Sequence, residues 1–115
     1  MIENDRNLAD EMNHYKPGDG ELAVWWMGQS GFLVKSRDCC ILFDPYLSTS
    51  LEDMTRNSPV IQHIRMMPIP VQPSWITCVD YILCSHDHKD HYDRDTVIPV
   101  LKANPGARIV IPFSA

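Results

Sequence analysis

The chain has 115 residues, 44% of them hydrophobic, which predicts one globular domain or a part of one. Its formal net charge of −5 argues against a nucleic-acid-binding surface. No apolar stretch is long enough to span a bilayer, and the charged start of the chain lacks the apolar core of a signal peptide. We therefore expect a cytoplasmic protein that binds neither membrane nor nucleic acid.

The first part of the chain is predicted to form a polar lead followed by three strands. A polar lead over residues 1–19, with some helix at 8–15, ends in a Pro-Gly turn. Apolar runs at 21–27, 32–35 and 39–43, separated by tight turns, predict an antiparallel sheet that is packed on one face. Gly28 and Gly31 are expected to permit the bend between the first two strands.

The second part of the chain predicts strand, loop, helix and strand. Residues 48–73 are irregular, and a stretch of this length favours a functional loop over a linker. A buried strand at 79–84 follows, then a helix that Asp93 or Asp95 caps and Pro99 shortens or kinks, and a strand at 107–111. This order of elements indicates a layered α/β or α+β fold.

Four cysteines are present: Cys39, Cys40, Cys78 and Cys84. They form no C-x-x-C pair, and the last two lie in or beside apolar runs. We expect free, mostly buried thiols of a reducing compartment, without a redox or metal role.

The chemistry of the sequence is concentrated in the run His86-Asp87-His88-Lys89-Asp90-His91. Imidazole and carboxylate are ligands that suit zinc, manganese or iron. The run directly follows a predicted buried strand, which would hold it in place while leaving it accessible. A solvated, charged loop is the alternative, but four potential ligands within six residues favour a metal site.

The spacing suggests how the ligands divide between two ions. In an extended turn His86 and His88 point the same way, so they can grip one metal together. Asp90 and His91 could reach a second metal, and two nearby metals can activate a water between them. Lys89 is expected to face solvent, Asp87 to carry a proton during catalysis, and Asp93 to do no more than cap the helix.

The run resembles the H-x-H-x-D-H motif of the metallo-β-lactamase superfamily. Residues 25–35, Trp-Trp-Met-Gly-Gln-Ser-Gly-Phe-Leu-Val-Lys, and residues 41–45, Ile-Leu-Phe-Asp-Pro, are similar to its L-ascorbate-6-phosphate lactonase branch. The resemblance covers roughly residues 20–112 and implies the N-terminal half of an αβ/βα sandwich, so that residues 1–115 would form the N-terminal part of such a domain. It implies a metal-dependent hydrolase, a lactonase acting on a small sugar-acid phosphate, with one or two Mn²⁺ or Zn²⁺ ions.

The resemblance also assigns roles to residues. His86 and His88 would bind the first metal, and Asp90 and His91 the second. Asp87 and Asp90 are the implied catalytic carboxylates. Asp44 corresponds to a buried aspartate that supports the metal loop, although a plain turn residue before Pro45 is an equal alternative. His63 and Arg65 could approach a phosphate, but a solvated loop is the simpler interpretation, and Trp25 and Trp26 are expected in a core or interface.

One departure from the family pattern limits the expected activity. The family takes further metal ligands from the second half of its domain, whereas no histidine follows His91 here. A catalytic metal typically needs three protein ligands, so we expect the isolated chain to be an incomplete enzyme. The alternatives are a non-catalytic metal-binding or interaction fragment, with a homo-oligomer formed through exposed apolar surface, and another metallo-hydrolase such as a phosphodiesterase.

Overall fold

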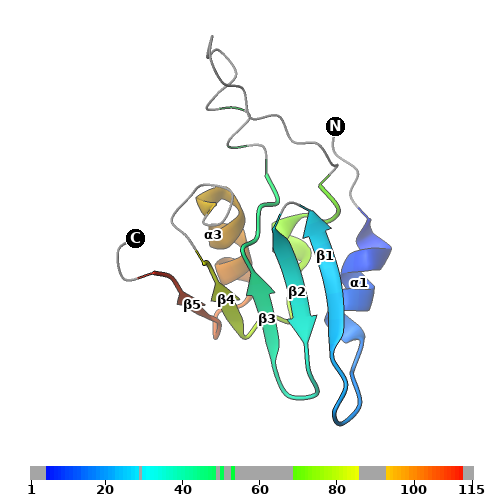
Figure 1. Ribbon diagram of the computed structural model, residues 1–115. Helices are drawn as coiled ribbons and strands as arrows, with labels where there is room; N and C mark the ends of the chain where they lie inside the picture. The colour runs from blue at the N-terminus through cyan, green and yellow to red at the C-terminus, as the bar shows by residue number, and fades with distance from the viewer. Residues whose placement is uncertain are drawn as a thin grey trace.

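The computed structural model describes residues 5–28, 30–48, 50, 53, 69–85 and 93–112. Within them the chain forms two helices, one short 3-10 helix and five strands (Figure 1). In chain order these are α1 (Arg6–His14), β1 (Ala23–Gly28), β2 (Gly31–Lys35), β3 (Cys40–Phe43), η1 (Pro73–Trp75), β4 (Tyr81–Leu83), α3 (Arg94–Ala103) and β5 (Arg108–Val110).

All five strands join one mixed sheet in the order β1-β2-β3-β4-β5. β1, β2 and β3 pair antiparallel, as their tight turns predict, whereas β4 pairs parallel with both β3 and β5. The parallel pairs require crossover connections, and α3 supplies the one between β4 and β5. The α/β class expected from the sequence is therefore confirmed.

The predicted elements differ from the observed ones mainly at their ends. α1 begins two residues before the expected helix, because Asp5 caps it by accepting a hydrogen bond from the Leu8 N–H at 3.1 Å. β4 and β5 are shorter than their apolar runs. Pro99 was expected to shorten or kink the helix. α3 extends past it, from Arg94 to Ala103, and holds Pro99 in its interior.

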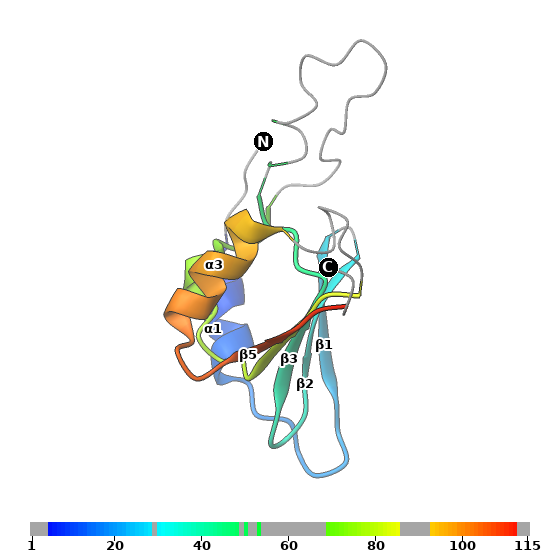
Figure 2. The same cartoon turned by 90° about the vertical axis from the view of Figure 1, so that its left-hand side faces the viewer.

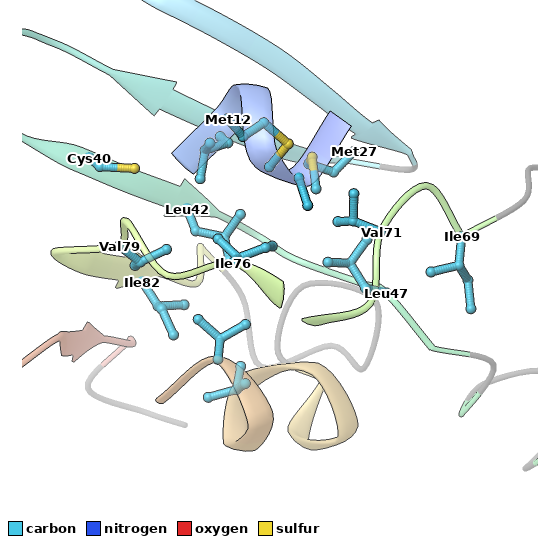
Figure 3. Close-up of a cluster of buried hydrophobic side chains, with 14 of the residues drawn as sticks. Met12, Met27, Cys40, Leu42, Leu47, Ile69, Val71, Ile76, Val79 and Ile82 are labelled. Carbon is cyan, nitrogen blue, oxygen red and sulfur yellow. The ribbon is translucent and has the colours of Figure 1, made fainter. Parts of the chain in front are cut away.

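Both helices and η1 cover the same face of the sheet (Figure 2). The core lies between the two layers and is built from alternate strand residues together with apolar side chains of the helices and connecting segments (Figure 3). Met12 of α1, Leu42 of β3, Ile82 of β4 and Val100 of α3 are each fully buried there. Period-2 alternation in the strands and helical spacing in α1 and α3 produce this single core.

The other face of the sheet carries apolar side chains that no described element covers. We call it the open face; its members, linked by strand register, are Val24, Trp26, Phe32, Val34, Ile41, Phe43, Tyr81, Leu83 and Val110. Trp26 is 54% exposed and Val110 49% exposed. Trp26 thus lies outside this core, whereas Trp25 packs against it and meets Tyr15 edge-on, with ring centroids 6.0 Å apart. Among the described helices, none is both long and apolar enough to cross a membrane.

Candidate functional site

The predicted metal-binding run follows the carboxyl end of β4. Because β3 and β4 are parallel, the carboxyl ends of both strands lie at the same edge of the sheet. Residues 86–92 lie outside the part of the chain that the structure describes, so the positions of His86, Asp87, His88, Asp90 and His91 stay predictions. Among the described residues no three His, Cys, Asp or Glu side chains group as metal ligands. The described part of the site consists of the residues on either side of the run.

Asp44 holds the residue that precedes the run. Its carboxyl group accepts two hydrogen bonds from Ser85, from the N–H at 2.6 Å and from the hydroxyl at 2.8 Å. The Asp44 N–H donates to the Leu83 carbonyl at 2.9 Å, which extends the pairing of β3 and β4 by one step. This first anchor fixes the backbone immediately before His86.

The backbone around Asp44 is unusual in a way that suits an anchor. Asp44 has φ of 44°, in the left-handed region that aspartate tolerates better than most residues. The bend between β1 and β2 packs closely against it: a Cβ at Gly31 would lie 3.2 Å from the Asp44 carbonyl oxygen. Gly28 has φ of 92°, so the two glycines permit this bend as predicted.

Asp93 holds the chain just after the run. It is buried, and its carboxyl group accepts hydrogen bonds from the Ser48 hydroxyl at 2.6 Å, the Ser50 hydroxyl at 2.8 Å and the Thr96 hydroxyl at 2.6 Å. The Thr96 hydroxyl in turn accepts the Leu47 N–H at 2.7 Å. Asp93 is the N-cap residue of α3, but its side chain accepts no backbone N–H of the helix. It acts as a second anchor instead of only capping.

The two anchors attach both ends of the run to one segment, residues 44–50. Ser85 binds Asp44 at the start of that segment, and Asp93 binds Ser48 and Ser50 near its end. Eight positions separate Ser85 from Asp93, so the described residues on the two sides of the run bind the same short stretch of chain. This segment continues directly from β3, and Leu42 of that strand is part of the core. The residues that flank the run are therefore both held by one support that continues from the core of the sheet.

Cys84, the last residue before Ser85, is buried and has an unreactive environment. Burial, reinforced by the negative charge of Asp44, raises the pKa of its thiol to about 11. The thiol is therefore neutral near pH 7, in agreement with the expectation of a free, buried cysteine at this position.

Sequence reasoning found Asp44 but missed most of the second anchor. Ser48, Ser50 and Thr96 carried no signal of their own, although the spacing of Asp93 and Thr96 is that of a helix start. His63 and Arg65, weighed as phosphate contacts, lie outside the described residues.

Comparison with known proteins identifies the fold family. Residues 23–111 match the family described as β-lactamase superfamily domain. Uncharacterized proteins of Mycobacterium bovis and Mycobacterium tuberculosis are 37% identical over 89 residues, which are 77% of this chain and 23% of each relative. Proteins named probable L-ascorbate-6-phosphate lactonase in Salmonella paratyphi B and Salmonella newport are 26% identical over 110 residues, covering 83% of this chain and 31% of each relative.

The chain thus spans about a quarter to a third of the length of these relatives. Its mixed sheet with helices on one face has the α/β architecture of a metallo-β-lactamase-like fold. The matched region runs from the first residue of β1 to the residue after β5, and so includes the whole sheet, both anchors and the histidine run. The chain belongs to the β-lactamase superfamily.

Proposed function

We propose that this chain supplies the metal-binding part of a metal-dependent hydrolase. The observation that carries the proposal is the pair of anchors, which join Ser85 to Asp44 and Asp93 to Ser48 and Ser50 on either side of the histidine run. A solvated loop would not require four hydroxyl groups and a backbone N–H to be committed to two carboxyl groups. A loop that must present several ligands in a fixed arrangement does require such support.

The donor set of the run fits one or two divalent ions. His86, His88, Asp90 and His91 would hold them, since imidazole and carboxylate suit Zn²⁺ and Mn²⁺. A bound ion lowers the pKa of a water molecule and polarises a substrate carbonyl.

The chain's own groups would support this chemistry in two ways. Asp44 holds Ser85, the residue that precedes His86, and would thereby support the first metal ligand of the run. Asp87, which follows His86 in the sequence, is the proposed proton carrier.

The proposed substrate is the lactone of a sugar-acid phosphate, such as L-ascorbate 6-phosphate. The support is similarity to relatives that carry the lactonase name, at 26% identity. A phosphodiesterase would use the same activated water, so a direct comparison of lactone and phosphodiester hydrolysis must separate the two activities.

The open face supports the proposal that this chain works within a longer hydrolase. The open face extends across all five strands, and a contiguous exposed apolar surface often marks an interaction site. The matched stretches of 110 and 89 residues make up 31% and 23% of the relatives, which are therefore more than three times as long as this chain. We propose that a second layer of such a polypeptide packs on this face and supplies the remaining metal ligands.

The test measures metal content and lactone hydrolysis in the longest natural form of the protein. The parent is expected to retain Mn²⁺ or Zn²⁺ after dialysis, and a His86→Ala/His88→Ala variant to lose it together with activity. His14→Ala is the matched control, because His14 lies on α1, outside the run. If the double variant held as much metal as the parent, the proposal would be wrong.

The interaction fragment remains the second candidate, because the open face is a specific feature that favours it. If the 115-residue chain functions alone, two copies would cover their open faces by packing them together, and sedimentation would show a dimer. Trp26→Ser should then dissociate the dimer without lowering metal content. A folded monomer at micromolar concentration would exclude this candidate.

A further inference from the structure

Two cysteines that are far apart in the sequence meet beneath the sheet. The Sγ atoms of Cys40 and Cys78 are 3.5 Å apart, and 38 positions separate the two residues. Cys40 opens β3 and is buried among the core side chains (Figure 3). Cys78 lies between η1 and β4 and is half-buried against the same core. Both are free thiols in this structure.

Hydrogen bonds fix the backbone on both sides of this pair. The Cys40 N–H donates to the Asp80 carboxyl group at 2.8 Å, and the Asp80 N–H donates to the Cys40 carbonyl at 2.9 Å. Next to Cys78, the Val79 N–H donates to the Asn104 side chain at 3.0 Å, and the Thr77 N–H to the Asn13 side chain at 2.9 Å. The two thiols are therefore held face to face by the fold.

The charges around the pair make its two members unequal. The hydrogen bond from Cys40, helped by the Lys35 ammonium, lowers the pKa of the Cys78 thiol to about 7 against the opposing effects of burial and Asp80. The same hydrogen bond together with burial raises the pKa of the Cys40 thiol. Cys40 is buried whereas Cys78 is half-buried, so Cys78 is the sulfur that a peroxide reaches first.

We propose that Cys40 and Cys78 form a thiol-oxidation site, at which a peroxide converts the facing dithiol into a reversible disulfide. The Cys78 thiolate attacks one peroxide oxygen, the O–O bond breaks, and the departing hydroxide is protonated to water. Cys40 sulfur then attacks the sulfur of the resulting Cys78 sulfenic acid, the S–O bond breaks, and hydroxide leaves with the Cys40 proton as water. The two thiols lose two electrons, and hydrogen peroxide is reduced to two molecules of water.

The site lies apart from the metal-binding run and does not depend on the proposed hydrolase. Cys40 begins β3, whereas Asp44 follows the other end of that strand. The expectation of free thiols agrees with the reduced structure, but the expectation that none has a redox role came from the absence of a C-x-x-C pair. Pairing across 38 positions has no such local signature.

The test treats the full chain with hydrogen peroxide, unfolds it, alkylates the remaining thiols and measures the intact mass. We expect two of the four cysteines to resist alkylation, and dithiothreitol to restore all four. Cys39 and Cys40 share one tryptic peptide, as do Cys78 and Cys84. The decisive variant is therefore Cys39→Ser/Cys84→Ser, which retains only the proposed pair and should form the intramolecular link as readily as the parent.

Cys40→Ser and Cys78→Ser should each abolish that link. Should either variant fold poorly, the double variant still decides the question, because its two remaining thiols are both native. Oxidation in denaturant is the control for proximity and should remove the preference for this pair. The inference is overturned if the folded double variant keeps both thiols alkylatable, links chains to one another, or stops at sulfinic acid.

Discussion

Replacing Asp93 by alanine should destabilise the protein more than any other change to a charged residue among those the structure describes. Asp93 is 2% exposed and accepts hydrogen bonds from three hydroxyl groups, so the substitution removes three acceptor contacts at once. The loss of stability differs between the three donors, because it depends on how deeply each hydroxyl group is buried.

Thr96 dominates the expected loss of stability. Its side chain is fully buried, so its hydroxyl hydrogen would have no partner, which costs about 1–3 kcal/mol. Ser48 and Ser50 are only half-buried, so water can replace the acceptor and each lost bond costs about 0.5–1.5 kcal/mol at most. Because these terms share one acceptor and are not additive, we expect a total of about 2–4 kcal/mol.

Urea unfolding followed by tryptophan fluorescence measures this loss, since the chain contains three tryptophans. Asp95→Asn is the matched control: Asp95 lies in the first turn of the same helix and is exposed, so its free energy of unfolding should change by less than about 0.5 kcal/mol. Equal losses in the two variants, or a loss below about 0.5 kcal/mol for Asp93→Ala, would refute the second anchor.

Four further outcomes are expected. Asp44→Ala should weaken metal binding by about 10–100-fold in a metal titration. Asp44→Asn should weaken it less, because asparagine can still accept the Ser85 N–H and tolerates positive φ. Equal effects of the two substitutions would contradict the role of Asp44 as an anchor. Leu42→Ala should lower the free energy of unfolding by about 2–5 kcal/mol, because Leu42 is fully buried, and a loss below about 1 kcal/mol in urea unfolding would contradict its core position. The alkylation rate of Cys78 should rise with pH to a midpoint near its pKa of about 7, because the thiolate reacts, whereas Cys84, with a pKa of about 11, should stay slow throughout; equal pH profiles would contradict the assignment. Oxidation of the Cys40–Cys78 pair should stabilise the fold by about 4 kcal/mol, as expected for a closed loop of 38 residues, and an unchanged melting temperature would contradict a strain-free link.

The sequence by itself determined the elements and the location of the chemistry. Short apolar runs bounded by turns predicted all five strands, and the tight turns predicted that the first three pair antiparallel. The density of ligands from His86 to His91, after a buried strand, pointed to one short run of metal-binding residues. These features can be read locally because each depends on neighbouring residues alone.

Only the tertiary structure decided which distant residues support one another. Asp93 meets Ser48 across 45 positions, Asp44 meets Ser85 across 41, and Cys40 meets Cys78 across 38. Nothing in the local pattern selects these partners, because each contact depends on the parallel pairing of β3 with β4 and on where α3 packs. The open face is likewise a result of packing. Successive side chains of the continuous apolar runs point to opposite faces of the sheet, so both faces are apolar, and both helices cover the same one.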